Sequence, residues 1–464
     1  MALKYLLQLI PSASGAVFPI LAAVFPHSTD SKRAHVAYVH NLLKIIDYAA
    51  ELRSDILLLI TERLVKIDVQ VQVDMEDLEE EVGEGLIEDV AKLRTPHEDL
   101  EDSDDEDDED DSITSDEILD EEAQRMKDVK SNVEKMDVIM DILFTYYGPF
   151  FSQNIEEKEN ALDILLSHFT TIILPTYRSR HTQFLLFHFA QTSPTLIDNF
   201  AGTCVHIAFD KSRPSILRQS AAAYLASFVA RGKHVPSQVV QDVFDIIRSQ
   251  LDSLLTEYEG ACRGPDLRRY ATFYALVQAL LYIVCFRWQD LRVDSDDYIE
   301  EDDITAFDEK QPAWAPGLKE TLYRTIHSPL NPLKVCSPAI VAEFARIAQH
   351  RDLIDVFSRL ETNKRLRLSR FTGSASRGSA YDQPDRETAL STKNDESYYQ
   401  LDAYFPFDPY HLPRSKKWIE GDYVEWKGIP EADEQKDEVD SDSESDEDVL
   451  SEVDEEGTGT EEGD

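Results

Sequence analysis

The sequence has few cysteines, few basic residues for its acidic content, and no long apolar run. Its four cysteines are far apart and show no CxxC spacing: Cys204, Cys262, Cys285 and Cys336. This pattern argues against a disulfide framework or a zinc ribbon and indicates a reducing compartment. No apolar run reaches the roughly 18 residues that a membrane-spanning helix needs, and the N-terminus lacks a signal-peptide cleavage pattern. We therefore expect a soluble, intracellular chain with no membrane partner.

Recognisable catalytic motifs are also missing. The sequence contains no Walker A loop, no GxGxxG after a strand, no HExxH and no GxSxG. It has no DxDxDG loop for calcium. His181 and His188 fall on one predicted helix face, but no carboxylate or cysteine accompanies them in the sequence. We expect no enzymatic activity, no cofactor and no metal site.

Positive charge is scarce, because 46 lysines and arginines face 91 aspartates and glutamates and leave a formal net charge of −45. The excess lies in two stretches: Asp74–Glu122 carries a net charge of −24 and Glu431–Asp464 carries −17, so the rest of the chain has only −4. Such dense like charge cannot be buried. We expect a long disordered acidic insertion and a disordered acidic tail attached to a nearly neutral folded body.

Apolar segments of helical length follow one another between Glu157 and Trp288. Each segment has one apolar stripe at helical spacing, which indicates an amphipathic helix that needs a neighbour. Taken in pairs, the first helices start near Glu157, Thr195 and Ser237, a period of 37 to 42 residues. This period is typical of HEAT or armadillo repeats, at roughly 40–47 residues. The sequence predicts an all-α, HEAT/armadillo-like helical-repeat solenoid; a non-repetitive helical bundle is the alternative.

Composition divides the chain into six regions. We expect N-terminal helical repeats at 1–73, a disordered acidic loop at 74–128, a HEAT-like solenoid at 129–362, a basic serine-rich loop at 363–398, an extended aromatic and basic strap at 399–430, and a disordered acidic tail at 431–464. Asp294–Asp303 forms a further acidic loop within the solenoid.

The strap at 399–430 combines prolines with aromatic and basic residues. Pro406, Pro409 and Pro413 exclude a regular helix. The segment is too aromatic for a free linker, so we expect it to dock in extended form on the helices.

Four serines lie within acidic stretches of the kind that acidophilic kinases prefer: Ser103, Ser441, Ser443 and Ser445. A phosphate there would mainly deepen the existing negative charge.

Nucleic acid is a poor partner for this composition. Lys364–Arg370 and Arg414–Lys417 are the only dense basic patches. The anionic remainder repels phosphate over a screening length of roughly 8–10 Å. We expect no stable direct DNA binding. A solenoid without a catalytic motif usually works as a recognition surface for large partners.

Six stretches together resemble the RNA polymerase I-specific transcription initiation factors of the TIF-IA family. They follow the order of that family and span most of the chain outside the acidic segments: FPHSTDSKRAHVAYVHNLLKI (Phe25–Ile45), ELRSDILLLITERLVKIDVQVQ (Glu51–Gln72), SRPSILRQSAAAYLASFVARGKHVP (Ser212–Pro236), FYALVQALLYIVCFRWQDL (Phe273–Leu291), SPLNPLKVCSPAIVAEFA (Ser328–Ala345) and YFPFDPYHLPRSKKWI (Tyr404–Ile419).

The resemblance implies a HEAT-repeat protein of the nucleus and nucleolus that binds RNA polymerase I on its stalk side. It implies a bridge from the polymerase to promoter-bound core-factor subunits, tuning by serine phosphorylation, and a self-associating homodimeric form. The family also has helical repeats before the position of Met1, and the first helix has no N-cap residue. We therefore expect a truncated or misassigned N-terminus.

The resemblance also suggests individual site residues. Ile10-Pro11-Ser12, followed by Phe18-Pro19, resembles a phospho-regulated position near the polymerase contact, with Ser14 a neighbouring candidate. The alternative role for Ser12 is that of a helix cap.

The resemblance extends to the strap, where Arg414, Lys416 and Lys417 are candidate partner-binding residues. A pinned strap or a nuclear import signal is the alternative. For the whole chain, the main rival function is a nuclear transport or scaffold solenoid without polymerase specificity.

Overall fold

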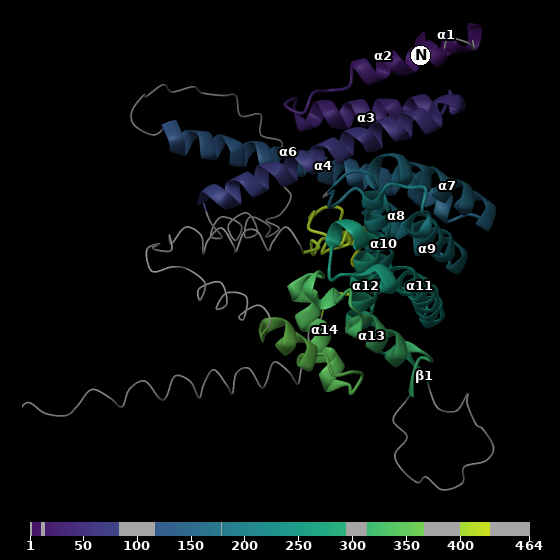
Figure 1. The fold of residues 1–464 in the computed structure, drawn as a ribbon. Helices are drawn as coiled ribbons and strands as arrows, with labels where there is room; N and C mark the ends of the chain where they lie inside the picture. The colour runs from purple at the N-terminus through teal and green to yellow at the C-terminus, as the bar shows by residue number, and fades with distance from the viewer. Residues whose placement is uncertain are drawn as a thin grey trace, which may run out of the picture. The chain divides into compact units, whose positions relative to one another are not determined.

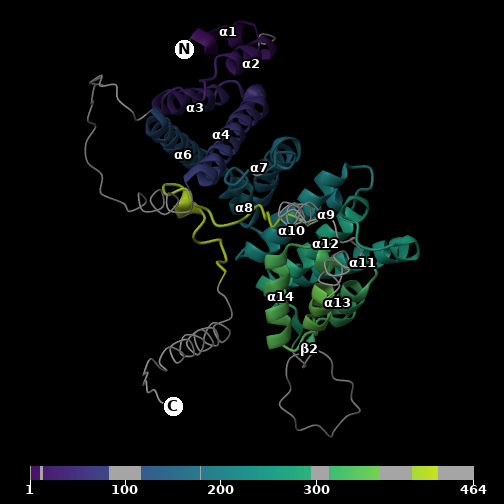
Figure 2. The same cartoon turned by 60° about the vertical axis from the view of Figure 1, so that its left-hand side comes forward.

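The computed structural model describes residues 2–10, 14–82, 117–177, 179–293, 313–365 and 400–426. Within these ranges nearly every element is a helix, and the only strands are two residues long (Figures 1 and 2). The predicted all-α, helical-repeat fold is confirmed. The acidic loops at 83–116 and 294–312, the serine-rich segment at 366–399 and the tail at 431–464 lie outside the described residues.

The N-terminal part contains α1 (Ala2–Leu9), α2 (Ser14–Ala23), α3 (Lys32–Ile46), the short η2 (Ala50–Leu52) and α4 (Arg53–Val82). Ser31 begins α3 because its side chain accepts a hydrogen bond from the backbone N–H of Ala34, 3.3 Å away. The helices α3 and α4 pack against each other and against α6 (Glu117–Phe151). These three helices therefore bury their apolar faces against one another.

Two predicted boundaries of the acidic loop are wrong. The helix α4 continues to Val82 and α6 already begins at Glu117, so residues 74–82 and 117–128 are helical. Residues 74–82 contain neither glycine nor proline, and the first helix breaker is Gly83. At the other end, residues 117–128 also contain neither glycine nor proline. Helix propensity there outweighs the density of like charge.

The central array contains α7 (Ile155–His168), continued by the π-helical η3 (Phe169–Ile173), then α8 (Phe184–Ala190), α9 (Pro194–Phe209), α10 (Ser215–Arg231), α11 (Ser237–Tyr258), η4 (Glu259–Ala261) and α12 (Leu267–Arg287). The starts of α7, α9 and α11 fall within two residues of the predicted positions. Asn154 and Asp266 cap α7 and α12 through their side chains. Each of these helices packs on a neighbour in the array: α8 packs on α7 and α9, α10 packs on α9 and α12, and α11 packs on α12.

The helix α12 forms the centre of this array. Among the described helices it is the one long and apolar enough to cross a membrane by length and composition alone. Most of its apolar stretch is buried, and it packs against α10, α11 and α14 (Pro338–His350). Its composition is therefore that of a core helix.

After α12 the chain forms a small hairpin and two more helices. The strand β1 (Arg292–Val293) pairs antiparallel with β2 (Ala313–Trp314), with Arg292 opposite Trp314. Then come α13 (Leu318–His327), η5 (Pro332–Lys334), α14 and a helical segment at 357–365. The helix α13 packs on α11, and α14 packs on α12.

Within the strap predicted at 399–430, residues 400–424 return to the central array in mostly extended form (Figures 1 and 2). The strap has one short 3₁₀ turn, η6 (Lys416–Trp418). It belongs to the same compact unit as the helices, Met1–Val424, whereas Glu425–Asp464 forms a second unit. The strap brings the C-terminal aromatic and basic residues onto helices that lie far away in the sequence.

Candidate interaction surfaces

The aromatic half of the strap is anchored by two phenylalanines. The Phe407 side chain is fully buried, and its ring lies within 4.8–5.5 Å of the rings of Phe187 and Phe184 on α8. The Phe405 ring stacks on Tyr282 of α12 at 3.7 Å. These side chains insert into the apolar faces of the array, which fixes the position of the strap.

Backbone groups of the strap are also satisfied by the helices. Gln183 donates from Nε2 to the Pro406 carbonyl oxygen at 2.7 Å, and the Phe407 N–H donates to Ser227 Oγ at 3.0 Å. The Tyr404 hydroxyl donates to the Ser179 carbonyl oxygen. The loop that contains Ser179 and Gln183 therefore carries part of the strap.

That loop is held by one buried carboxylate, Asp68 of α4. Asp68 Oδ2 accepts hydrogen bonds from Ser179 Oγ and from the backbone N–H groups of Arg180, His181 and Thr182. The Nδ1 atom of His181 lies 2.9 Å from Asp68 Oδ1. Burial alone would raise the pKa of Asp68, but His181 and these donors outweigh it and lower the pKa. The expectation that no carboxylate accompanies His181 is therefore wrong, because Asp68 approaches from a distant helix.

The basic half of the strap binds two carboxylates of α6. The backbone N–H groups of Arg414 and Ser415 donate to Asp137 at 2.7 and 2.8 Å. Asp141 accepts from Arg414 Nε at 3.0 Å, and from Lys417 Nζ and Trp418 Nε1 at 2.9 Å each. Partial burial would raise the pKa of Asp141, but these donors outweigh burial and hold its pKa below the usual value.

The three predicted strap cations still face solvent. Arg414 and Lys417 share Asp141, and Lys416 lies 3.7 Å from Glu420. The side chains of Arg414, Lys416 and Lys417 remain 60%, 51% and 59% exposed. Arg414 and Lys417 therefore each have a largely buried partner, whereas Lys416 pairs with an exposed one, and all three cations remain accessible.

The end of the strap is fixed by Asp422. Its carboxylate lies 2.5 Å from His188 Nδ1 and 3.1 Å from His234 Nε2. The backbone of Tyr423 forms an isolated antiparallel bridge with Gly232. His188, like His181, therefore has a carboxylate partner that no local sequence pattern indicates.

Of the predicted regulatory serines, Ser14 is described and is the half-buried first residue of α2. No residue of α2 is buried. Large apolar side chains around it are exposed: Tyr5 by 65%, Leu9 by 63% and Ile20 by 61%. Ser12, Ser103, Ser441, Ser443 and Ser445 lie outside the described residues.

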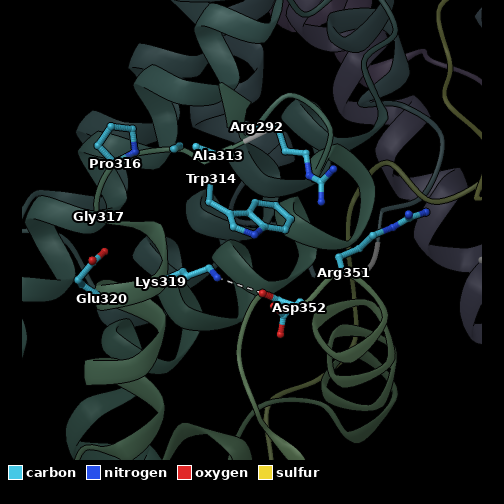
Figure 3. A pocket seen from close by; sticks show the side chains of 10 residues that line it. Arg292, Ala313, Trp314, Pro316, Gly317, Lys319, Glu320, Arg351 and Asp352 are labelled. Atoms are coloured by element: carbon cyan, nitrogen blue, oxygen red, sulfur yellow. Dashed lines mark hydrogen bonds between the residues drawn. The ribbon is translucent and has the colours of Figure 1, made fainter. Parts of the chain in front are cut away.

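A polar cavity of about 390 Å³ lies at the far end of the array (Figure 3). It is lined by the β1–β2 hairpin, the start of α13 and the end of α14. Arg292, Trp314 and Arg351 line it together with Lys319, Glu320 and Asp352. No sequence pattern indicates this site, because its residues come from three separate elements without a shared motif.

With the fold and these surfaces described, comparison with known proteins is informative. The sequence profile of the family described as RNA polymerase I specific transcription initiation factor RRN3 matches residues 1–431. This chain belongs to the RRN3 family. The resemblance seen in the sequence is thereby confirmed.

Individual RRN3 relatives agree with this assignment. The chain is 30% identical to the RNA polymerase I-specific transcription initiation factor rrn3 of Schizosaccharomyces pombe, over 96% of this chain and 69% of the relative. It is also 30% identical to RRN3 of Saccharomyces cerevisiae, over 91% and 70%, and to RRN3 of Mus musculus, over 92% and 60%. The chain thus spans between 60% and 70% of the length of these relatives.

The fold matches as well. A crystal structure of RNA polymerase I transcription initiation factor Rrn3 superposes with a TM-score of 0.66 at 28% identity, covering 91% of this chain and 72% of that chain. The helical-repeat architecture is therefore that of a solved RRN3 family member.

Proposed function

We propose that this chain binds RNA polymerase I and makes it competent to start ribosomal RNA synthesis. The observation that carries the proposal is the RRN3 family match over residues 1–431, with a matching fold. The RRN3 relatives are named as RNA polymerase I-specific transcription initiation factors. The proposal assigns the chain no catalytic activity and places its action in the nucleus, within the nucleolus.

We further propose that the chain bridges two partners. It contacts the stalk side of the polymerase and promoter-bound core-factor subunits at the same time. The exposed sides of Arg414, Lys416 and Lys417 support a contact with an acidic protein surface, because all three charges remain accessible and Asp141 of α6 holds Arg414 and Lys417 in place. The proposal includes no stable direct DNA binding.

Regulation is proposed at Ser12 and Ser14. Tyr5 and Leu9 of α1 and Ile20 of α2 are exposed apolar side chains in the same N-terminal part of the chain as Ser14, and exposed apolar side chains support a protein contact there. A phosphate adds about −1.5 to −2 charge at neutral pH, which would oppose docking on an acidic partner. Phosphorylation of Ser103, Ser441, Ser443 and Ser445 would add to charge already present. A homodimer that covers the polymerase surface is a further regulatory state in the same proposal.

A pull-down with purified RNA polymerase I and RNA polymerase II, repeated over a salt series, tests the proposal. We expect retention of polymerase I alone. Core-factor subunits added afterwards should join the complex only when the chain is present. The variants Ser12→Asp and Ser14→Asp should weaken retention, whereas the serine-to-alanine variants should not.

Equal retention of both polymerases would contradict the assigned specificity. Capture of polymerase I without core factor would contradict the bridge but leave the polymerase contact intact. Unchanged retention of the two aspartate variants would reduce Ser12 and Ser14 to residues at a helix start. Co-purification with import or export receptors in place of polymerase would favour the transport alternative.

A further inference from the structure

Two arginines that line the cavity at the far end of the array, Arg292 and Arg351, lie against tryptophan rings. The Arg351 guanidinium lies over the Trp288 ring at 4.2 Å. The Arg292 guanidinium lies 5.4 Å from the centre of the same ring and 4.9 Å from that of Trp314. Cation–π stacking of this kind fixes the guanidinium planes and leaves their N–H edges available.

Neither arginine has an anionic partner among the described residues. No hydrogen bond or ion pair of either guanidinium is found there, and the Nε atoms of both are buried without an acceptor. Burial lowers the pKa of Arg292, and the nearby charge of Arg351 lowers it further. Two like charges are therefore held close together with no anionic partner in the described part of the chain.

Arg287 is a buried arginine whose charge is compensated: it donates from Nε to Asp290 at 2.6 Å and from its Nη atoms to the backbone carbonyl oxygens of Gly232 and Val235. The Nε atoms of Arg53, Arg63 and Arg359 are buried without an acceptor, as are those of Arg292 and Arg351. What distinguishes Arg292 and Arg351 is that both lie against the Trp288 ring. Two neighbouring cations with no anionic partner among the described residues are suited to binding an oxyanion.

The remaining cavity wall adds positive potential on one side. The helix α13 starts here after Gly317, whose φ of +83° favours glycine. A Cβ atom at Gly317 would lie 2.5 Å from Arg248 Nη1, so the glycine also lets Arg248 approach. Lys319 is held by its hydrogen bond to the Asp352 carbonyl oxygen at 3.1 Å.

Two carboxylates limit what can enter. Glu320 and Asp352 line the cavity, and in Figure 3 Glu320 lies on the opposite side from Arg292 and Arg351. A nucleic-acid strand would bring neighbouring phosphates against these carboxylates. A single oxyanion on a side chain can reach the arginines without that repulsion. The volume of about 390 Å³ is within the range of small-ligand sites.

We propose that this cavity binds one phosphomonoester group, presented on a phosphorylated side chain of a protein partner. The guanidinium edges of Arg292 and Arg351 hydrogen-bond the phosphate oxygens, and Trp288 and Trp314 keep the guanidinium groups in place. This site is separate from the strap and from the Ser12 and Ser14 region. The proposal does not depend on which polymerase the chain binds.

Calorimetric titration of the full chain tests the proposal. The probes are inorganic phosphate, a short peptide with one phosphoserine, the same peptide with serine or glutamate in its place, and a single-stranded RNA of similar charge. We expect the phosphoserine peptide to bind at least about tenfold more tightly than the serine peptide, since charge-assisted bidentate hydrogen bonds are strong. The glutamate peptide should be intermediate, and the RNA should not compete.

The matched variants separate the site from general charge. The double variant Arg292→Gln/Arg351→Gln should lose about tenfold or more in phosphopeptide affinity. The control Arg324→Gln/Arg346→Gln removes two arginines that pair with Asp252 and Glu343, and it should bind as the unchanged chain does. Arg292→Lys/Arg351→Lys keeps the charge but loses the planar fork, and should bind with intermediate affinity. If circular dichroism shows that the glutamine variant is unfolded, the lysine variant decides the question.

Three outcomes would overturn the proposal. The first is absence of phosphate-dependent peptide binding. The second is an equal loss in the Arg324 and Arg346 control, which would indicate general surface charge. The third is RNA that binds through Arg292 and Arg351, which would replace the ligand class.

Discussion

The strap and the polar cavity both contain clustered basic residues, but these residues differ in whether they have a carboxylate partner among the described residues. In the strap, Arg414 and Lys417 meet Asp141 at about hydrogen-bond distance. In the cavity, Arg292 and Arg351 are stacked on tryptophans and have no carboxylate partner in the part of the chain that the structure describes. The strap cations therefore hold the molecule together, while the cavity cations are left available for a ligand.

This difference shows why a basic run in a sequence is weak evidence for a binding site by itself. The Arg-Ser-Lys-Lys run attracts attention because its charges are adjacent. Its partners lie on α6, more than 270 residues earlier in the chain. The cavity cations are separated in sequence and escape notice, yet they carry the uncompensated charge. Substitutions of single residues test whether the strap is structural and the cavity arginines are not.

The largest effect should come from removing the apolar anchor of the strap. Phe407→Ala creates a cavity among Phe184, Phe187 and Phe228. We expect a loss of about 3–5 kcal/mol in the free energy of unfolding, measured by urea denaturation. The control Tyr323→Ala removes a ring that is 60% exposed and should change stability by less than about 0.5 kcal/mol. A loss of stability in Phe407→Ala as small as that in Tyr323→Ala would mean that the strap is not an integral part of the fold.

A somewhat smaller loss should follow Asp68→Asn. The substitution removes the buried carboxylate that receives the N–H groups of the loop under the strap and lies 2.9 Å from His181 Nδ1. Because several buried donors lose a charged acceptor, we expect a loss of about 3 kcal/mol by urea denaturation. Asp163→Asn on the exposed face of α7 is the matched control. Limited proteolysis should cleave the strap faster in the Asp68 variant, and unchanged cleavage would contradict its supporting role.

The strap also contains a carboxylate that should destabilise it at neutral pH. Burial, only partly offset by Arg231 and Arg180, raises the pKa of Asp408 to about 6. An acid with a raised folded-state pKa adds stability as pH falls through about 6 toward its ordinary value near 4, because the folded state binds the proton first. Asp408→Asn should therefore raise stability at pH 7.5 by on the order of 2 kcal/mol and lose that advantage at about pH 4.

The difference between the Asp408→Asn variant and the unchanged chain is the quantity to measure. Burial lowers the pKa of His168 to about 4, so that group makes the chain less stable as pH falls below about 6.5, the opposite direction. Subtracting the two urea-denaturation curves at each pH removes this contribution. A difference that does not change between pH 4 and 7.5 would contradict the assignment to Asp408.

Removing the carboxylate of Asp141 should leave two strap cations without an anionic partner, as is the case for the two arginines of the cavity. In Asp141→Asn, Arg414 and Lys417 lose their shared anionic partner, and we expect a loss of about 1–2 kcal/mol by thermal or urea unfolding. Because its folded-state pKa is lowered, Asp141 should stabilise the chain above about pH 4 and lose that effect below it. Glu420→Gln, which removes the exposed partner of Lys416, should have little effect. An effect of Asp141→Asn as small as that of Glu420→Gln would contradict the role of Asp141 in holding the strap on α6.

The smallest change in stability should follow Arg351→Gln in the cavity. The variant loses one cation–π contact with Trp288 but also relieves repulsion of Arg292. We expect a net change below about 1 kcal/mol in unfolding free energy. A loss as large as that of Asp141→Asn would mean that Arg351 has a structural role comparable to the strap cations, which would weaken the contrast drawn here.

The helical array could be predicted from the sequence because its signal is local. Apolar stripes and breaks such as Ser193-Pro194 place α9 and α11 within about two residues of their observed starts. The ends of the acidic loop do not follow from the same local reasoning, because α4 continues through densely acidic sequence to Val82. Charge density predicts poor burial, but it does not by itself stop a helix.

The interaction surfaces could be predicted only in part. The prolines of the strap excluded a helix, and its aromatic residues indicated docking, which agrees with the buried Phe407. Which carboxylates receive the strap could not be predicted, because Asp68 and Asp141 approach through tertiary packing. The cavity was missed for the same reason, since Arg292 and Arg351 come from different elements.

The most direct test of the proposed role in initiation is promoter-specific transcription of ribosomal DNA with purified RNA polymerase I and core factors. We predict that correctly initiated transcript accumulates only when this chain is added, and that transcription from an RNA polymerase II promoter is unaffected. The Phe407→Ala variant, which should loosen the strap, should support less transcript than the Tyr323→Ala control. Equal transcript with and without the chain would contradict its role as an initiation factor.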